Sequence, residues 1–534
     1  MGPARASLAS LLLVLCTALW LTASPRLSLL LTHTAWLTLG TLALSLPLGV
    51  PLGVAIGKVE FSGRRLLTCL LISLLFVPLY VHAASCQAAF GYGGWLQQGF
   101  GIDPRWFVGL SAAVLVHATA AVPWVALLTA ASLASAERPL EEQTLLDAHS
   151  KQVLTRVSLP HAGGGIAAAI LWIALVCSTE IVVTDLFAVR TFAEEIFTQA
   201  SLGVLGSDTG ESTDLLRGIT ILLLFTLACF ALLAPWAMRV AAVSMNLAPW
   251  RWRPKYFRLF AVLTWSLALS IIAFPLVSLA WKAGLVTTGA PPEITQSWSP
   301  LATLTLVTAS LWDFRREMGW SLTIGCFASL ASVVVAALGF WFARRSHWLL
   351  VGLAIAAALL LAIPAPMWGV WTVRLLNQPA DSLLSPLATL YDHTLVGCVL
   401  VQAIRALPIA LVVVATQLAN IPTEILDAAR SDGAGQWRQL MRVALPMRRT
   451  AFMTALLVGL AVAIGELSAT FLVLPPGVTP LSRRLFGLLH YGADDQVAAV
   501  SLALMLLVAV VAGLSLVILG KWNRVEPTIE DSSK

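Results

Sequence analysis

The chain has 534 residues, of which 58% are hydrophobic and only 11% are charged. Soluble domains carry about 25% charged residues, so this composition excludes an ordinary soluble globule and favours an integral membrane protein. The net charge of +6 would suggest a nucleic-acid partner in a soluble protein, but here we expect it to reflect Lys and Arg on the cytoplasmic side of a membrane, with lipid and no nucleic acid as partner.

Apolar runs of about 20 residues recur along the chain, and each can cross a hydrocarbon core roughly 30 Å thick as a helix. Stretches such as 500–516 do not alternate between polar and apolar residues as barrel strands would, which favours an all-α fold. The sequence predicts about twelve transmembrane helices, at 7–24, 30–57, 66–87, 106–134, 163–186, 214–237, 259–282, 319–342, 348–373, 393–419, 451–474 and 495–519.

The first predicted span has a second interpretation. Residues 1–24 also fit a signal peptide, because Arg5 precedes an apolar run that ends in small residues. The next span begins shortly afterwards, which favours a retained first helix. Lys and Arg gather in alternate short loops, as at Lys58, Arg64 and Arg344. Such loops stay in the cytoplasm, so we expect the N-terminus inside.

The two halves of the sequence repeat each other at a nearly constant spacing. The matched positions, 285 or 286 residues apart, are Pro78 and Pro364, Val122–Pro123 and Leu407–Pro408, and Glu180 and Glu466. Prolines and a glutamate are uncommon in apolar segments, so these matches indicate an internal duplication. The same number of spans separates the matched points in each half. We therefore predict two parallel repeats around a pseudo-twofold axis along the membrane normal, with a solute pathway between them.

The predicted repeats divide the chain into five parts. An N-terminal helix would occupy 1–29, the first repeat 30–237 and the second repeat 319–519. Between the repeats, 238–318 would contain one transmembrane helix and an outward loop, and 520–534 would form a cytoplasmic tail.

One cytoplasmic loop in each half is longer and more polar than its neighbours. In the second half, Thr423 follows a proline and predicts the start of a short helix, and Gly433 predicts its end. Apolar residues then recur at helical spacing and predict an amphipathic helix lying on the membrane: Trp437, Leu440, Met441 and Ala444.

This loop resembles the EAA loop of ABC importer permeases, which reads roughly Glu-Ala-Ala, then Asp-Gly-Ala, then Leu-Pro. The matching residues are Asp427, Ala428, Ala429, Asp432, Gly433, Ala434, Leu445 and Pro446, with Asp427 in place of the usual glutamate. The first-half loop resembles it less closely, and its corresponding residues are Glu142, Asp147, Ala148 and Pro160. There Gln143 and Thr144 replace the alanines and Ala148 replaces the glycine.

The resemblance implies two tandem copies of the type I permease fold in a bacterial inner membrane. It also implies that the two loops bind two copies of a separate cytoplasmic ATPase, and that a periplasmic binding protein delivers the solute. Segments 465–470, 474–477 and 489–492 are similar to fused permeases of the ferric-iron type. We therefore expect ferric iron as the solute, with thiamine or another small solute as the alternative.

Three charged residues lie away from the ends of the predicted spans, namely Glu180, Glu466 and Arg405. A charge near mid-bilayer costs about 2.5–3.5 kcal/mol, so we expect each to face a cavity or a partner. Two interpretations stay open: the matched glutamates line the pathway, or Glu466 neutralises Arg405. Residue 120, which matches Arg405 in the first half, is an alanine.

We expect no cofactor, no metal and no enzymatic activity in this chain. The sequence contains no GxxxxGK[ST] motif for ATP, no HExxH or GxSxG motif, and no paired cysteines among its seven. Four polar residues of an outward loop could bind iron but more readily form a solvated or docking surface: His490, Tyr491, Asp494 and Asp495. An ion-coupled secondary transporter is the main rival class, which predicts more buried acids and inverted repeats.

Overall fold

The computed structural model describes residues 2–134, 138–202, 211–241, 250–288, 295–379, 381–492 and 494–522. Helices dominate these residues, and one antiparallel hairpin pairs β1 (Leu285–Thr288) with β2 (Thr295–Trp298). The predicted all-α, polytopic architecture is therefore confirmed.

The first half begins with the long helices α1 (Gly2–Leu21) and α2 (Pro25–Lys58). The elements that follow are α3 (Arg64–Leu75), α4 (Leu79–Phe90), α5 (Trp95–Phe100), η1 (Pro104–Trp106), α6 (Gly109–Ala134), α7 (Arg138–Asp147), α8 (Ser150–Val153), the π-helical turn η2 (Leu154–Ser158), α9 (Leu159–Thr179), α10 (Val182–Leu186), α11 (Phe192–Ser201) and α12 (Glu211–Ala241).

The two halves are joined by α13 (Phe257–Ala283), the hairpin and α14 (Pro300–Asp313). The second half then contains α15 (Arg315–Ala343), α16 (His347–Ala362), α17 (Ala365–Leu376), α18 (Pro386–His393), α19 (Val396–Ala419), α20 (Thr423–Ser431), α21 (Gln436–Gln439), the π-helical turn η3 (Leu440–Ala444), α22 (Leu445–Met447), α23 (Arg449–Gly465), η4 (Thr470–Val473), α24 (Leu481–Tyr491) and α25 (Asp494–Trp522).

Six helices among the described residues are long and apolar enough to cross a membrane, and counting each of three bent pairs as one span raises this number to nine. These nine coincide with nine of the twelve predicted spans. The helices α1, α12 and α25 lie at the other three predicted positions.

Matched prolines break one span in each half. Pro78 separates α3 from α4, which meet at 100°, and Pro364 separates α16 from α17, which meet at 101°. Proline has no N–H to donate and pushes the residue before it towards extended backbone, so a helix stops there. The spans predicted at 66–87 and 348–373 are therefore each divided by a bend into two helices.

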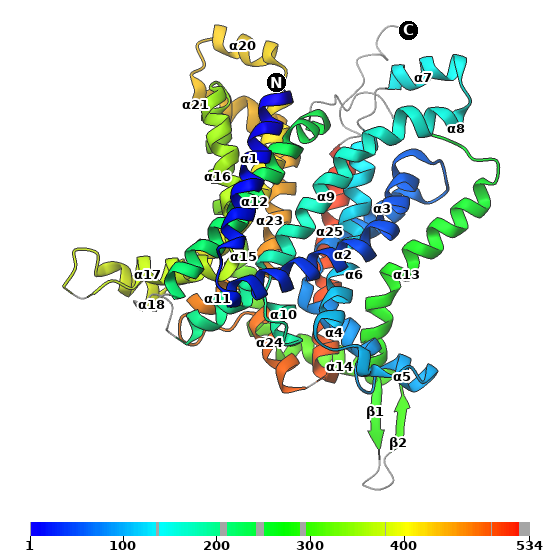
Figure 1. Ribbon diagram of the computed structural model, residues 1–534, viewed down its shortest axis with the longest axis vertical. Coiled ribbons are helices and arrows are strands. Elements are labelled where there is room, and N and C mark those ends of the chain that lie inside the picture. The colour runs from blue at the N-terminus through cyan, green and yellow to red at the C-terminus, as the bar shows by residue number, and fades with distance from the viewer. Residues whose placement is uncertain are drawn as a thin grey trace.

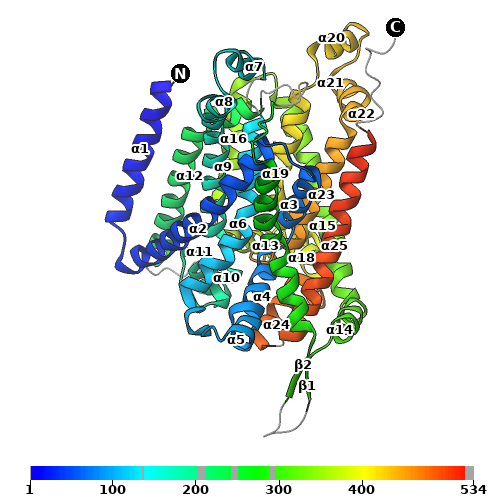
Figure 2. The ribbon, with the colours of Figure 1, turned by 90° about the vertical axis from the view of Figure 1, so that its right-hand side faces the viewer.

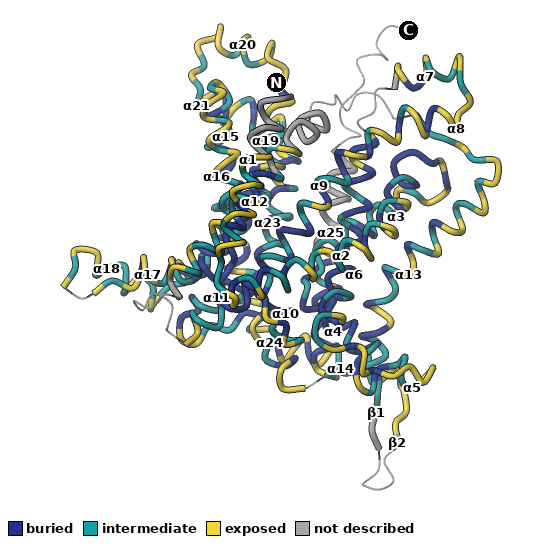
Figure 3. The backbone as a smooth tube through the Cα atoms, viewed as in Figure 1, coloured by how far each residue is buried: buried dark blue, intermediate teal, exposed yellow. Residues whose placement is uncertain are grey.

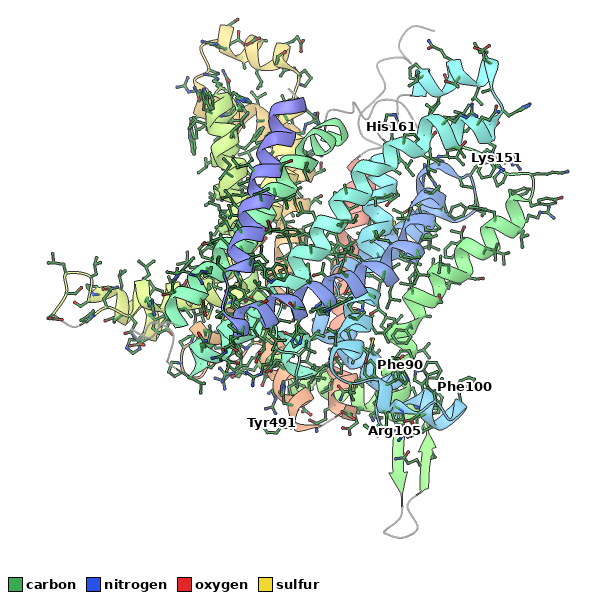
Figure 4. The ribbon with its side chains drawn as sticks, viewed as in Figure 1. Phe90, Phe100, Arg105, Lys151, His161 and Tyr491 are labelled. Atoms are coloured by element: carbon green, nitrogen blue, oxygen red, sulfur yellow. The ribbon has the colours of Figure 1, made fainter. Side chains whose placement is uncertain are left out.

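The molecule has two distinct ends along its longest axis. The helices α7 and α20 lie at one end and the β1–β2 hairpin lies at the other, as Figures 1 and 2 show. We call these the α7/α20 end and the hairpin end. Lys151 and His161 lie towards the first end, whereas Arg105 and Tyr491 lie towards the second (Figure 4).

Each half ends in a helix that packs on the other half. Helix α12 contacts α16, and α25 contacts α3 and α4. The helices α1 and α13 also take equivalent places, because α1 packs on α12 and α13 packs on α25. One buried apolar cluster accordingly contains side chains of both halves, among them Tyr80, Val182, Leu467 and Leu485. The halves therefore interlock, and any space between them is enclosed by both.

Candidate functional site

A cavity of about 500 Å³ lies between the two halves. Its wall is mainly apolar and includes Trp124 and Trp172, whose ring centroids are 4.6 Å apart. On α19 the lining residues run from Arg405 through Ile409 to Val413, one helical turn after another. Because α20 follows α19 at the α7/α20 end, the cavity extends from mid-molecule towards that end.

Five His, Glu and Arg side chains line this cavity: His82, His117, Glu180, Arg405 and Glu466. The three residues singled out from the sequence are thus brought to one place, although Glu180 and Glu466 are 286 positions apart. The two histidines were not singled out. In an apolar helix a histidine is usually a packed core residue, so the sequence pattern offers no means of distinguishing these two.

The predicted spans 163–186 and 451–474 placed both glutamates inside helices, but the structure does not. Helix α9 ends at Thr179 and α23 ends at Gly465, so Glu180 and Glu466 follow directly after the helix ends. Hydropathy misses this break because the apolar run continues past it. The break exposes N–H groups that lipid cannot satisfy, and each glutamate bonds to such groups.

The carboxylate of Glu180 accepts hydrogen bonds from the N–H groups of Val182 and Val183, the first residues of α10. His117 faces the same carboxylate, with its Nε2 3.6 Å from Oε2 of Glu180. The ring is oriented by its Nδ1, which donates to the carbonyl of Ala113 at 2.8 Å. Glu180 therefore joins α9, α10 and α6.

Glu466 is more completely bonded and is 8% exposed. Its Oε1 accepts from the N–H of Ala469 at 2.8 Å, and its Oε2 accepts from the N–H of Thr470 at 2.9 Å and from the Thr470 hydroxyl. Gln402 on α19 donates to that hydroxyl at 3.3 Å. In both halves the glutamate therefore holds the start of the next short helix.

Arg405 forms no ion pair within 4.0 Å in the described part of the chain, although the negative charge of Glu466 acts on it. Its Nη1 is buried and has no hydrogen-bond partner. The direct Glu466–Arg405 pair that the sequence left open is thus absent from these contacts.

Side chains of both halves pack together between the cavity and the hairpin end. The Tyr80 hydroxyl lies 3.5 Å from the carbonyl oxygen of Ile464, and the rings of Phe197 and Phe471 are 5.6 Å apart. His490 on α24 also reaches Asp185 on α10, with 3.2 Å between Nε2 and Oδ2. These contacts join the halves at the hairpin end.

Of the remaining polar residues of the predicted outward loop, one has a charged partner and the other two are exposed. Asp494 pairs with Lys282 at 3.0 Å, and Tyr491 is 89% exposed. Among the described residues there is no group of three or more His, Cys, Asp or Glu side chains that could hold a metal ion.

The first polar loop forms α7 and α8 and is held by a buried ion pair. Lys58 at the end of α2 and Glu141 on α7 are 2.5 Å apart and both fully buried. Ser158 also donates to Glu141 at 2.5 Å. The predicted residues Glu142 and Asp147 are exposed instead. Sequence reasoning missed Glu141, because two adjacent glutamates do not reveal which one turns inward.

The second polar loop forms α20 and α21 as expected. Helix α20 begins at Thr423 and ends before Gly433, whose φ of +80° is the left-handed conformation that glycine adopts at little cost. The N–H groups of Gly433 and Ala434 bond back to carbonyls of Arg430 and Ala429 at 3.0 Å. The short polar helix and its glycine turn are therefore confirmed.

The residues that carry the resemblance in this loop are mainly at the surface. Those exposed are Asp427, Ala428, Asp432, Gly433 and Pro446, whereas Ala429 is half-buried. In the first loop Pro160 is exposed and Ala148 is half-buried. Figure 3 shows α20 as a largely exposed segment.

The predicted apolar face of the next helix is divided. Leu440 and Ala444 are buried in the protein, whereas Trp437 is 55% exposed and Met441 is 38% exposed. The π-helical turn over Leu440–Ala444 widens the helix and changes the spacing on which the prediction relied.

The sequence is similar to transport permeases of several bacteria. A 2-aminoethylphosphonate transport system permease protein, PhnV, of Salmonella typhimurium is 38% identical over 92 residues, 17% of this chain and 35% of that protein. The molybdenum transport system permease protein ModB of Haemophilus influenzae is 30% identical over 131 residues, 24% of this chain and 55% of that protein. The glycine betaine/carnitine transport permease protein GbuB of Listeria monocytogenes is 24% identical over 165 residues, 28% of this chain and 57% of that protein.

No family model matches the chain. The matches cover 35% to 57% of the length of these three relatives, and all three are transport permeases rather than enzymes. The helices that can span a membrane, the enclosed cavity and these similarities agree with one another. The chain is therefore a multi-pass membrane protein that is similar to the permeases of ABC importers.

Proposed function

We propose that this chain is the membrane-spanning subunit of an ATP-driven importer in a bacterial inner membrane. The cavity between its two halves would be the solute pathway, with Glu180, Glu466 and Arg405 in its wall. Two copies of a separate cytoplasmic ATPase would bind the two polar loops, and a periplasmic binding protein would deliver the solute. The observation that carries this proposal is a cavity enclosed by both halves and directed towards the end that bears both loops.

The proposed ATPase contacts are exposed or half-buried residues of the two loops. They are Glu142, Asp147, Ala148 and Pro160 in the first loop, and Asp427, Ala428, Ala429, Asp432, Gly433 and Pro446 in the second. Large apolar side chains beside them support docking, because Leu146 is 85% exposed and Trp437 is 55% exposed. Aromatic side chains such as Trp437 are enriched at protein interfaces.

The loops are connected mechanically to the cavity. In the first half, residues Ser150–Thr179 form one continuous helical stretch that ends at Glu180 in the cavity wall. In the second half, α21–α22 and α23 meet at 81°, and α23 ends at Glu466. A movement of either loop would therefore reach the cavity. Closure of an ATPase dimer would draw the loops together and separate the contacts at the hairpin end.

We infer that the halves are tandem copies of one permease repeat, 30–237 and 319–519, joined by 238–318, with 1–29 as an added outer helix and 520–534 as a tail. Similar features support this: a proline break, a π-helical turn before the Leu-Pro pair, and a glutamate after the next helix. Ferric iron is the solute suggested by resemblance, with thiamine or another small solute as the alternative.

The docking proposal is tested by the two turn residues. A valine at position 433 would have to adopt the φ of +80° that costs an L residue roughly 1–2 kcal/mol. We expect Gly433→Val to reduce co-purification of the ABC ATPase encoded beside this chain at least about tenfold, as a loss of about 1.4 kcal/mol of binding would. The matched control is Ala148→Gly, which should leave co-purification unchanged. Normal ATPase yield with Gly433→Val would contradict this proposal.

A further inference from the structure

The polar side chains in the cavity wall differ in how many hydrogen bonds they already form within the protein. Both carboxylates already accept hydrogen bonds from backbone N–H groups: Glu180 from Val182 and Val183, and Glu466 from Ala469 and Thr470. Each carboxylate therefore uses part of its roughly four lone-pair sites on the protein itself, which leaves fewer for a bound cation. Both carboxylates therefore already have a structural role, which is to hold the backbone segments that follow them.

The guanidinium of Arg405 is in the opposite situation. Its Nη1 is buried without a hydrogen-bond partner, and no acid lies within 4.0 Å of it in the described ranges. A guanidinium has five N–H donors and no acceptor, so an unpaired one inside a membrane span is costly. An acceptor that enters the cavity would relieve this cost.

The positive charge of Arg405 has no counterpart at the matching position of the first half. The matching residue of the first half, Ala120, also lines the cavity and has no charge. His117, three residues before Ala120 on α6, faces Glu180 at 3.6 Å. Among the described residues that line the cavity, Arg405 is thus the one Lys or Arg side chain, and no acid lies within 4.0 Å of it.

We propose that Arg405 binds an anionic group of the transported solute, a carboxylate, a phosphonate or another oxyanion, within this cavity. The planar guanidinium matches two oxygens of such a group with two parallel N–H bonds. This inference rests on the proposed function, because the solute must enter the cavity. It favours an anionic solute, or an anionic complex of a metal, over a bare ferric ion.

The test uses the full chain, purified in detergent without ATPase or binding protein, and follows its thermal unfolding. Molybdate, 2-aminoethylphosphonate and citrate are the anionic probes, and choline is the cationic control. We expect at least one anion to raise the unfolding midpoint by about 2 °C or more, because a ligand of the folded state stabilises it. Choline should give no shift.

Variants assign the shift to Arg405. We expect Arg405→Gln to abolish the shift and Arg405→Lys to leave a smaller one, because lysine keeps the charge but loses the planar fork. Arg65→Gln, an equal change at an exposed residue in the first turn of α3, is the control and should keep the full shift. If Arg405→Gln does not fold, a full-sized shift in Arg405→Lys contradicts the proposal, and a reduced one supports it.

Three results would overturn the inference: no shift of the wild-type midpoint by any anion, an equal shift by choline, or a full shift in Arg405→Gln. Failure here with normal ATPase co-purification would leave the proposed transport function intact. Failure of the unaltered chain to co-purify with the ATPase, with the anion shift preserved, would instead contradict the proposed function.

Discussion

The two halves hold their polar loops to the membrane helices by different chemistry. In the first half a fully buried ion pair, Lys58–Glu141, joins the end of α2 to α7. In the second half the indole of Trp341, on α15, donates to the carbonyl of Gln436 at 3.1 Å, and Arg344 lies 3.2 Å above its ring. The polar loop is thus attached to a membrane helix by an ion pair in the first half and by an aromatic side chain in the second half.

The difference teaches that a repeated backbone can keep its geometry while the contacts that secure it diverge. The glutamates at the cavity follow the same rule. Glu180 and Glu466 both bond to the N–H groups of the segment that follows them, but Glu180 faces His117 and Glu466 faces Thr470. Equivalent positions therefore differ in what a mutation would remove.

The strongest test of the comparison is whether both loops share one side of the membrane. Single cysteines replace Ser150 in the first loop, Ser431 in the second and Ser297 in the hairpin, in a chain without other cysteines. All three serines are exposed, so each cysteine can react with a thiol reagent. We expect an impermeant reagent added outside to label only position 297, and inverted vesicles to give the reverse pattern.

Labelling of position 150 but not 431 from the same side would mean that the halves are antiparallel. In that case the comparison between the loops, and the proposed ATPase docking, would both fail.

The next largest effect concerns the buried ion pair. Lys58→Met leaves Glu141 charged and buried without a cation, which costs about 3–5 kcal/mol, and the unfolding midpoint in detergent should fall accordingly. The double variant Lys58→Met/Glu141→Leu removes both charges and should recover most of the stability. A Trp341→Phe variant, which loses one hydrogen bond in the matching join, should cost only about 1 kcal/mol. Equal losses in the two halves would contradict the comparison.

The smallest effect distinguishes the two glutamates. At position 466 both carboxylate oxygens accept N–H bonds, so Glu466→Gln turns an amide donor towards one backbone donor and should cost about 1–3 kcal/mol. At position 180 a glutamine can keep its oxygen on Val182 and Val183 and turn its amide towards His117. We therefore expect Glu180→Gln to change the unfolding free energy by less than about 1 kcal/mol, measured by the same thermal unfolding.

If Glu180→Gln lowers the unfolding free energy as much as Glu466→Gln does, the difference in hydrogen bonding between the two glutamates does not determine the stability of the variants. The uptake of solute by each variant that folds then reports separately on the proposed pathway role.

Much of the helical layout follows from local chemistry and could be predicted. Long apolar runs locate helices at the twelve predicted positions, and the glycine at 433 locates the turn after α20, because only glycine adopts the required φ at little cost. The prolines at 78 and 364 were recognised as a repeated pair, but their 100° and 101° bends were not expected. The sequence is apolar on both sides of each bend, so hydropathy does not reveal the bends.

The composition by itself determined that the chain is a helical membrane protein, because too few charges are present to solvate a surface and long apolar runs require lipid. The repeat spacing identified Glu180 and Glu466 as a matched pair. It also showed that Arg405 has no charged counterpart in the first half. Only the tertiary structure decided that these three line one cavity, that both glutamates hold the starts of helical segments, and that Glu141 rather than Glu142 pairs with Lys58. Such contacts join residues up to hundreds of positions apart, and they depend on which face of each helix packs inward, which periodicity cannot specify in helices that are apolar on every side.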